Sequence, residues 1–312
     1  MATRVAVLDD YQQIAEHVAD WSHERLDVTF FSDHIADQDE LVELLRGFEV
    51  VVAMRERTPL AAELIARLPD LRLIVTTGSR NASIATDAGV LVCGTRSLTS
   101  PTVELTWALI LAQHRNLPAE QQSLRNGGWQ LSVGEGLEGS TLGLLGLGNI
   151  GSRVARVGQA FGMEVIAWSQ NLTAEASAEH GVTRVEKNEL FARADVLSVH
   201  VRLSERTLGI VDEAALKSMK PRALLVNTSR AQIVDQQALE RALEQSWIGG
   251  AALDVFDEEP LPQQHPLRSV PNALLTPHLG YVVRQNYEIF YTDAVDAILA
   301  FLDGNPIRVV EQ

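Results

Sequence analysis

Residues 141–151, TLGLLGLGNIG, join a short apolar run to three glycines in the spacing G-x-G-x-x-G. The run is typical of a buried strand, and the apolar residues after it recur at the 3.6-residue period of a helix. Strand, glycine turn and helix in this order are the context in which such a turn binds a dinucleotide. The alternative is a turn that only serves the fold.

Each position of this turn has a physical reason. The first glycine permits the tight turn, the second leaves room for a pyrophosphate, and the third lets the helix pack closely on the strand. The backbone N–H groups that begin the helix point at the phosphates. We therefore predict that the turn binds a dinucleotide through Gly146, Gly148, Asn149, Ile150 and Gly151.

Composition excludes several classes of protein. With 26 Lys and Arg against 41 Asp and Glu, the net charge of −15 argues against nucleic acid and against an anionic membrane as the partner. An anionic substrate must then be attracted by a local group of arginines.

The single cysteine, Cys93, allows neither an intrachain disulfide nor a cysteine-based zinc site and fits a reducing cytoplasm. The histidines show no metal-ligand spacing, so no metal is expected. The N-terminus lacks a signal-peptide pattern, and no apolar run has the length of a membrane span.

The chain alternates between expected strands and expected helices, which predicts an α/β fold with parallel sheets covered on both faces. Besides the run at 142–147, we expect strands at 5–8, 28–31, 50–53, 71–75, 164–168, 195–201, 223–226, 251–256 and 273–275. A length of 312 residues favours two domains. Because the last helix, 287–302, is expected to return to the N-terminal domain, that domain is discontinuous: residues 1–100 and 285–312, with residues 101–284 forming the other. We expect residues 117–139 to be an irregular loop of functional or interface type.

Two polar loops follow strands of the first domain. Arg55 and Arg57 come after the strand at 50–53, and the sequence TTGSRN, residues 76–81, comes after the strand at 71–75. Open α/β sheets bind ligands at the carboxyl ends of their strands. The first loop therefore predicts an anion-binding arginine, Arg55, and the second a set of backbone N–H groups for a carboxylate. A solvated charge cluster and an ordinary turn are the alternatives.

Three successive strands of the second domain deliver Arg230, Glu259 and His278 at their carboxyl ends. These are the groups required to pass a hydride between a nicotinamide and a 2-oxo acid. An arginine binds the substrate carboxylate with two hydrogen bonds. A histidine gives a proton to the developing alkoxide, and a glutamate beside it favours the imidazolium and orients the ring. Taken singly, each residue is more typical of a surface or packed position.

The adenosine end of the cofactor site is less well marked. A carboxylate that binds the ribose hydroxyls is expected roughly 20 residues past the glycine motif. Here the strand at 164–168 ends in Ser169-Gln170-Asn171, with no acid and with no arginine beside it to pair with a 2′-phosphate. We predict that Ser169 and Gln170 bind the ribose and that the cofactor is NAD, although NADP stays open.

Four motifs together identify a family. GLGNIG at 146–151, NTSRAQIVD at 227–235, ALDVFDEEP at 252–260 and TPHLG at 276–280 stand in the order and spacing of the D-isomer-specific 2-hydroxyacid dehydrogenases. The chain resembles this family, in particular its phosphoglycerate dehydrogenase and glyoxylate–hydroxypyruvate reductase members. The resemblance implies two Rossmann-like, doubly wound parallel-sheet domains, with a discontinuous substrate domain and a cleft between the domains.

The resemblance also implies roles for single residues. It supports Arg230, Glu259 and His278 as catalytic residues, and it places Asp254 at the nicotinamide carboxamide. Further cofactor contacts are expected from His200 and Thr228, and substrate contacts from the backbone of Gly78 and Ser79. Apart from the family pattern, Arg80 adds a cation near this loop and favours an acid with a second anionic group. The family is usually homodimeric, with residues 93–139 contributing to the dimer contact.

The sequence departs from the family pattern at Ala231, where glycine is common, at Arg202, where proline is common, and at Tyr281, where the residue is usually small. An oxidoreductase of D-2-hydroxy acids and 2-oxo acids remains the favoured function. One alternative is an NAD(H)-sensing, corepressor-like binding protein on the same fold. Another is a dehydrogenase of a different small anion such as formate, which would require no proton transfer to a carbonyl oxygen.

Overall fold

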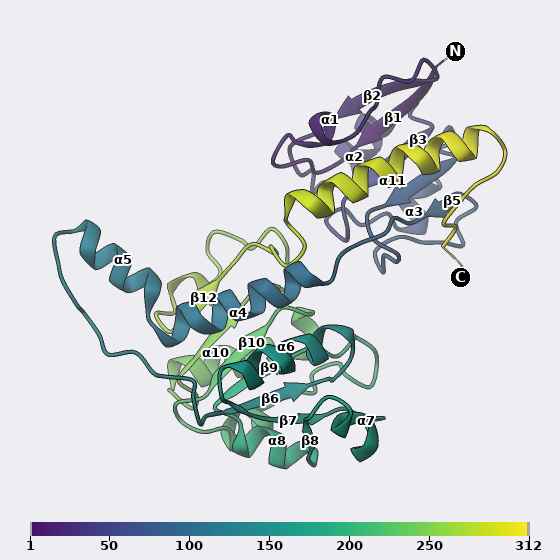
Figure 1. The fold of residues 1–312 in the computed structure, drawn as a ribbon. Coiled ribbons are helices and arrows are strands. Elements are labelled where there is room, and N and C mark those ends of the chain that lie inside the picture. Colours follow the sequence, from purple (N-terminus) through teal and green to yellow (C-terminus); the bar gives the residue numbers. More distant parts are fainter. Residues whose placement is uncertain (1, 311–312) are drawn as a thin grey trace. The chain divides into compact units, whose positions relative to one another are not determined.

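The computed structural model describes residues 2–310 and divides into two compact units (Figure 1). Unit 1 comprises the chain up to Leu98 together with the segment from Val282 onward, and unit 2 comprises Thr99–Tyr281. Both are built on parallel sheets, which confirms the expected α/β class with two doubly wound domains. Among the described residues, no helix has the length and apolar character needed to cross a membrane.

Unit 1 contains a five-stranded sheet in the order β2-β1-β3-β4-β5. Its strands are β1 (Thr3–Val7), β2 (Leu26–Phe30), β3 (Val50–Ala53), β4 (Leu73–Thr76) and β5 (Leu91–Cys93), and its helices are α1 (Ala15–Val18), α2 (Gln38–Leu45), α3 (Ala62–Ile65) and α11 (Arg284–Leu302). The strand order reverses between β1 and β3, and the carboxyl ends beside such a reversal are where open α/β sheets bind ligands.

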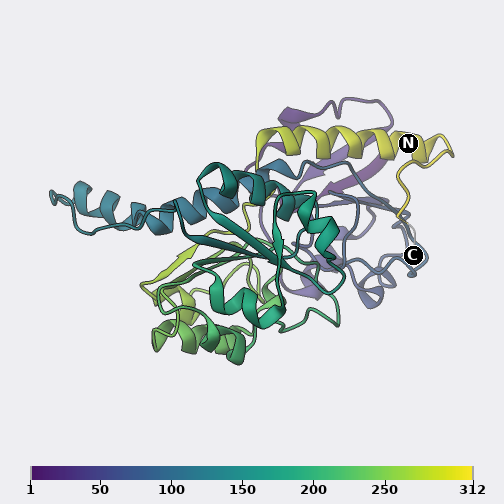
Figure 2. The same cartoon turned by 60° about the horizontal axis from the view of Figure 1, so that its bottom comes forward.

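Helix α11 explains why the last segment of the chain belongs to unit 1 (Figure 2). Tyr287, Phe290, Tyr291, Ala294 and Ile298 recur at helical spacing and are all buried. Tyr291 also meets Trp21, from the N-terminal part of the chain, edge to face. This buried stripe brings the C-terminal helix back to the N-terminal sheet.

Unit 2 contains a seven-stranded sheet in the order β12-β11-β10-β9-β6-β7-β8, in which every pairing is parallel. Its strands are β6 (Thr141–Leu145), β7 (Glu164–Trp168), β8 (Thr183–Arg184), β9 (Val196–Val199), β10 (Leu224–Asn227), β11 (Gly250–Leu253) and β12 (Ala273–Leu275). The order reverses between β6 and β9, as it does in dinucleotide-binding sheets.

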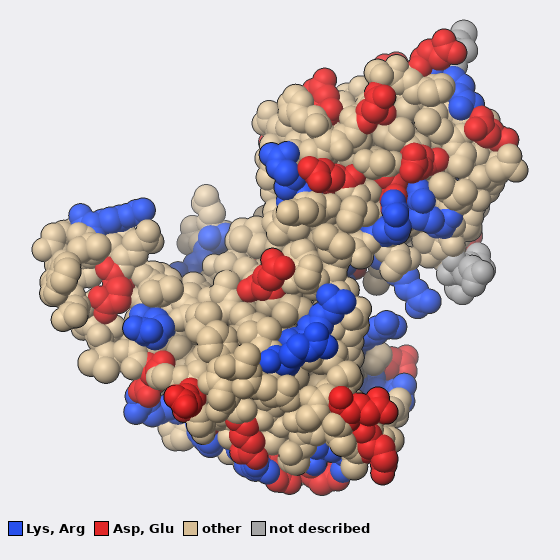
Figure 3. Space-filling view, in the orientation of Figure 1, with Lys and Arg blue, Asp and Glu red and all other residues tan. Residues whose placement is uncertain are grey.

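Helices cover both faces of this second sheet. One core joins the sheet to α8 (Lys187–Arg193), α9 (Glu213–Ser218) and α10 (Gln236–Glu244), and the other joins it to α4 (Ser100–His114) and α6 (Asn149–Ala160). The remaining elements are α5 (Leu117–Arg125), α7 (Ala174–Ala178) and the short 3₁₀ turns η1 (Ala231–Ile233) and η2 (Pro266–Ser269). On the face drawn in Figure 3, acidic and basic side chains are interspersed over the surface of each unit.

The expectation of an irregular segment at 117–139 was wrong in its first part. Residues 117–125 form α5, and together with the loop after it this helix stands away from the rest of unit 2 in both ribbon views (Figures 1 and 2). No residue of α5 is buried. Its sequence therefore lacks the apolar period by which a packed helix is recognised, although Ala, Glu, Gln and Leu all favour helix.

Candidate active site

The glycine turn joins β6 to α6 as the motif predicts. Gly146 has a φ of +105°, and a Cβ added there would lie 2.8 Å from the carbonyl carbon of His200. A Cβ on Gly151 would lie 2.2 Å from the Gly146 carbonyl oxygen, so the helix packs directly on the turn. A Cβ on Gly148 would meet no atom within 4 Å. The space beside Gly148 is open, as a passing pyrophosphate requires.

The N-terminus of α6 is the part of the turn that the sequence predicts to bind an anion. Gly148 is the N-cap and supplies no side-chain hydrogen bond to the first turn of the helix. The first backbone N–H groups of a helix have no partner within it, and they carry the positive end of the helix dipole. Asn149, Ile150 and Gly151 stand in this first turn. The residues present therefore fit the pyrophosphate of a dinucleotide.

The adenosine end contains a cation that the sequence did not reveal. Strand β8 pairs with β7 and places Arg184 opposite Ala167, close to the Ser169 loop. The Arg184 Nε donates to the Leu172 carbonyl oxygen at 3.0 Å, and its guanidinium pairs with Glu186 at 2.8 Å. The sequence did not reveal this neighbour, because a strand of two residues carries too little pattern to predict its pairing. Since the guanidinium already has these two partners, the prediction that no arginine stands ready for a 2′-phosphate is not overturned.

His200 and Thr228 lie at the carboxyl ends of β9 and β10. Burial lowers the pKa of His200 to about 4, so the imidazole is neutral near pH 7, and its Nε2 lies 2.8 Å from the Ser198 hydroxyl. The buried Thr228 hydroxyl lies 2.9 Å from the Thr106 hydroxyl on α4. Both predicted cofactor contacts are thus uncharged hydrogen-bonding groups. His200 follows β9, the neighbour of β6 in the sheet, and Thr228 follows β10, one strand further away.

The carboxyl ends of β10, β11 and β12 are neighbours in the sheet, and they carry Arg230, Glu259 and His278. The structure joins two of these residues directly: the His278 Nδ1 lies 2.6 Å from a Glu259 carboxylate oxygen. A carboxylate can only accept, so Nδ1 carries a hydrogen and donates it. The other carboxylate oxygen accepts the Phe256 N–H at 2.9 Å, which fixes the glutamate. Tyr281 packs edge to face on the imidazole, with 5.5 Å between ring centroids.

Arg230 is held by the end of its own strand. Asn227, the last residue of β10, donates from its side-chain amide to the Arg230 carbonyl at 2.9 Å and accepts the Ser229 N–H at 3.0 Å. The Ser229 hydroxyl in turn donates to the Val201 carbonyl at 2.7 Å. One Arg230 guanidinium nitrogen donates to the Ser229 carbonyl at 2.8 Å. The backbone of this loop is therefore fixed before any ligand binds.

Asp254 follows β11 and is completely buried. One of its carboxylate oxygens accepts from the Thr276 hydroxyl at 2.6 Å and from the Leu279 N–H at 2.7 Å. The other accepts from the Gly280 N–H at 2.8 Å. Burial raises the pKa of this carboxyl, and the three hydrogen bonds oppose the rise because they favour the carboxylate.

In unit 1 the predicted arginine loop and glycine loop lie against each other. Arg55 has a φ of +52°, and its backbone N–H donates to the Thr77 hydroxyl at 2.9 Å. Its guanidinium occupies the space of the missing Gly78 side chain, since an added Cβ would lie 2.1 Å from Nη1. The Gly78 N–H donates to the Thr95 hydroxyl at 2.7 Å and so serves the fold.

Of the other residues predicted in these loops, Ser79 and Arg80 are exposed. The Asn81 side chain, which the sequence did not single out, donates to the Arg55 carbonyl and ties the two loops together. The predicted substrate groups of unit 1 therefore form one local cluster at the carboxyl ends of β3 and β4.

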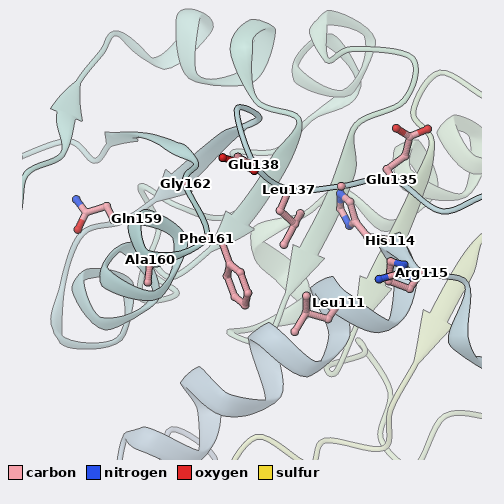
Figure 4. A pocket seen from close by; sticks show the side chains of 11 residues that line it. Leu111, His114, Arg115, Glu135, Leu137, Glu138, Gln159, Ala160, Phe161 and Gly162 are labelled. Atoms are coloured by element: carbon pink, nitrogen blue, oxygen red, sulfur yellow. The ribbon is translucent and has the colours of Figure 1, made fainter.

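A cavity of about 550 Å³ lies elsewhere in unit 2, between the C-terminal ends of α4 and α6 (Figure 4). His114, Leu137 and Phe161 are among its lining residues. Burial lowers the pKa of His114, whose Nδ1 donates to the Ile110 carbonyl of its own helix. None of the predicted site residues lines this cavity, so it is not part of the candidate active site.

Comparison with known proteins agrees with these observations. Residues 107–280 match the family model described as D-isomer specific 2-hydroxyacid dehydrogenase, NAD binding domain. The chain is 39% identical over 256 residues to a glyoxylate reductase of Aeropyrum pernix, covering 78% of this chain and 76% of the relative. It is 35% identical to an (S)-sulfolactate dehydrogenase of Chromohalobacter salexigens, covering 87% of this chain and 90% of the relative.

Among solved structures, a phosphoglycerate oxidoreductase of Vibrio cholerae o395 superimposes with a TM-score of 0.92 at 39% identity, covering 97% of this chain and 100% of that one. The family model spans more than half of the chain and lies within unit 2, which is therefore the NAD-binding domain. The chain belongs to the D-isomer-specific 2-hydroxyacid dehydrogenases, a family of NAD-dependent oxidoreductases.

Proposed function

We propose that this protein interconverts a small 2-oxo acid and the corresponding D-2-hydroxy acid, with Arg230, Glu259 and His278 as its catalytic residues. The observation that carries the proposal is the 2.6 Å hydrogen bond between His278 and Glu259, on strand ends next to that of Arg230. A proton donor with a fixed orientation beside a permanent cation is what reduction of a 2-oxo acid requires.

Arg230 binds the substrate carboxylate and polarises the carbonyl oxygen. Its planar guanidinium can give two parallel hydrogen bonds to a carboxylate, which fix the direction of the acid as well as its position. The loop that carries it is held by Asn227, so less freedom is lost when the substrate binds.

His278 supplies the proton. Its Nδ1 is committed to Glu259, so Nε2 is the nitrogen that gives its hydrogen to the developing alkoxide during reduction and takes it back during oxidation. Glu259 accepts the Nδ1 hydrogen and so holds the ring in one orientation. Within the catalytic set, His278 exchanges the proton with the substrate and Glu259 acts through His278, from the far side of the ring.

The bound nicotinamide supplies or accepts the hydride. The residues that would hold the dinucleotide are the glycine turn and the first turn of α6 at the pyrophosphate, and Ser169 and Gln170 at the ribose. His200, Thr228 and Asp254 remain the predicted contacts at the nicotinamide end. The pairing of Arg184 with Glu186 gives no unpaired charge for a 2′-phosphate and supports NAD over NADP.

For the substrate we propose a small acid, bound in part by Arg55, Ser79 and Arg80. The Gly78 N–H, which the sequence predicts as a further contact, is already bonded to Thr95. The three similar proteins described above carry names for glyoxylate, sulfolactate and phosphoglycerate, and two of these acids have a second anionic group. The exposed Arg80 beside the Arg55–Gly78 cluster supports such a group in this chain too.

A substrate panel tests the proposal. Glyoxylate, hydroxypyruvate, pyruvate, branched 2-oxo acids and 2-oxo acids with a terminal sulfonate or phosphate are supplied with NADH or NADPH, and cofactor oxidation is followed at 340 nm. We expect reduction of at least one 2-oxo acid with NADH, more slowly with NADPH. Oxidation of formate by NAD with no 2-oxo acid reduced, or NADH binding without any turnover, would replace the proposal by one of the two alternatives.

We also propose that the protein is a homodimer and that α5 and the loop after it form the contact. Five apolar side chains of this segment are exposed: Leu117, Leu124, Trp129, Leu131 and Val133. Exposed apolar residues gathered on one segment mark an interaction surface. A contact between identical patches on two copies would bury them in pairs.

A further inference from the structure

We propose that Glu186 makes this protein select NAD over NADP, because its carboxylate pairs with Arg184, a cation that lies against the predicted ribose loop, residues 169–172. The inference rests on the proposed function, in which Ser169 and Gln170 of this loop bind the adenosine ribose. It assigns to Glu186 the negative charge that the glycine motif predicts at the end of β7 and that is missing there.

The register of β7 and β8 brings Glu186 level with Ser169. The two strands are parallel and pair Ala167 with Arg184. The Val185 N–H donates to the Ala167 carbonyl at 3.0 Å, so the ladder continues past that pair. Because parallel strands advance by the same length per residue, Glu186 and Ser169, each two residues further on, stand about one strand spacing, ~4.8 Å, apart. The acid expected after β7 therefore has a counterpart at the end of the neighbouring strand.

Arg184 is fastened to the ribose loop. Its Nε donates to the Leu172 carbonyl at 3.0 Å, and the Leu172 N–H donates to the Ser169 carbonyl at 3.1 Å, which closes the loop into a turn. The arginine side chain is 33% exposed, so a ligand can reach it. A planar guanidinium that is held through Nε presents its Nη groups to an anion. If no carboxylate were bound to it, Arg184 would suit the 2′-phosphate of NADP.

Glu186 supplies that carboxylate. One of its oxygens accepts from an Arg184 Nη at 2.8 Å. Glu186 is also the N-cap of α8, yet its side chain accepts no hydrogen bond from the first turn of this helix. The N-cap aspartates Asp37, Asp212 and Asp235 each accept such a bond in their own helices. The Glu186 carboxylate is therefore committed to the arginine and not to the helix.

The ion pair is neutral as a whole, whereas the two cofactors differ in charge at the ribose. A phosphate monoester carries about −1.5 to −2 charges near pH 7, and the 2′-hydroxyl of NAD carries none. A neutral pair gives the 2′-phosphate no net attraction to offset its desolvation, and it costs NAD nothing. Because the Glu186 side chain is 73% exposed, the pair adds little to the stability of the fold. Its removal should act on cofactor choice and not on folding.

The test compares Glu186→Gln, Arg184→Gln, the double variant and a matched control with the wild type. Glu186→Gln leaves Arg184 as an unpaired cation at nearly constant side-chain volume, and the double variant removes that cation again. The control is Glu189→Gln, which removes the same charge from the same helix, where Glu189 pairs with Arg193 at 2.6 Å. The readouts are the dissociation constants of NADH and NADPH, measured by nucleotide fluorescence.

We expect Glu186→Gln to bind NADPH roughly tenfold more tightly than the wild type does, the value of one hydrogen bond to a charged group. Its NADH dissociation constant should change by less than about threefold, as for other surface substitutions. The gain should disappear in the double variant, and Arg184→Gln should not show it. Glu189→Gln should resemble the wild type. An unchanged NADPH affinity in Glu186→Gln, or the full gain in the double variant, would overturn the inference.

Nucleotides that lack the nicotinamide locate the effect and require no turnover. Glu186→Gln should bind adenosine 2′,5′-bisphosphate more tightly than the wild type does, with the affinity for 5′-AMP unchanged. An equal gain for both nucleotides would overturn the inference, because the charge would then act on the 5′-phosphate as well.

The binding assays also separate this inference from the proposed reaction. A wild type that reduces none of the 2-oxo acids, with the expected NADPH shifts present in the variants, would overturn the proposed reaction alone. A wild type that reduces a 2-oxo acid, with the NADPH affinity unaltered in Glu186→Gln, would overturn the role of Glu186 alone.

Discussion

The two ring nitrogens of His278 have different tasks. Nδ1 donates to Glu259 at 2.6 Å, and in the proposed reaction Nε2 exchanges its proton with the substrate. The sequence predicts that His278 and Glu259 both stand at strand ends, since each follows an expected strand. It does not predict that they touch, because the loop from 254 to 260 that brings the glutamate back toward β12 has no periodic pattern.

Substitutions of Arg230 should weaken the binding of the 2-oxo acid. Arg230→Ala should raise the KM of the 2-oxo acid and lower kcat/KM by roughly 10- to 100-fold, the value of one or two charged hydrogen bonds. The kcat/KM of Arg230→Lys should lie between that of Arg230→Ala and that of the wild type, because lysine keeps the charge but lacks the planar guanidinium. Steady-state kinetics with NADH held saturating measures both, and an unchanged KM in Arg230→Ala would remove the arginine from the substrate site.

The buried imidazole of His200 should make the free energy of unfolding depend on pH. Burial lowers its pKa from 6.5 to about 4, so between these values the unfolded chain binds a proton that the folded chain does not. The free energy of unfolding must therefore fall as the pH falls from about 6.5 toward 4, by at most about 3 kcal/mol from this residue.

Urea unfolding at pH 7.5 and at pH 5 measures this effect. His200→Gln cannot titrate in this range and should lose less stability on acidification than the wild type, while a variant of the exposed His180 should follow the wild type. Equal losses in all three proteins would mean that His200 is not held neutral by the fold.

The glycine turn is the element that the sequence defines most completely. The strand, the turn and α6 all occur where the motif places them. Gly146 and Gly151 each answer a separate steric demand of the local structure, and Gly148 leaves the space beside the turn open. The short strand β8 and the helix α5 are the opposite case. One has two residues and the other has no buried side chain, so neither leaves a readable period.

Gly148→Val tests the turn as a cofactor site. Its φ of −85° suits any residue and an added Cβ meets no protein atom within 4 Å, so the fold should tolerate the change. We expect at least a tenfold rise in the NADH dissociation constant, or about 1.4 kcal/mol, because the side chain takes the place of the pyrophosphate. Gly136→Val, another open glycine, is the control. Normal NADH binding by the Gly148 variant would contradict the assignment.

A charge placed in the segment containing α5 should weaken the proposed dimer. Trp129→Glu places a charge on a side chain that is 77% exposed, in the middle of the proposed dimer contact. Sedimentation velocity should show a shift from dimer to monomer. Leu208→Glu, at an apolar residue of 63% exposure outside this segment, should leave the dimer intact. The dimer proposal fails if the wild type is a monomer or if Trp129→Glu sediments as the wild type does.

For the whole molecule, the parallel α/β class follows from the alternation of buried strands and helices. The return of the last helix to unit 1 follows from its long apolar stripe. What the sequence could not supply is the way side chains are paired within the loops: Asp254 with the turn at 276–280, Asn227 with the Arg230 loop, and Arg55 with the space above Gly78. These contacts depend on the strand order, which brings together residues that are far apart in the chain.

The proton-donor role of His278 is tested most directly by comparing His278→Ala with the wild type and with His180→Ala in two assays, turnover of the preferred 2-oxo acid and binding of NADH. We expect kcat to fall by roughly 10²–10⁴-fold in His278→Ala alone, with the NADH dissociation constant unchanged, because the imidazole gives the proton and the cofactor is held elsewhere. Full turnover in His278→Ala, or a loss of NADH binding that matches the loss of rate, would contradict that role.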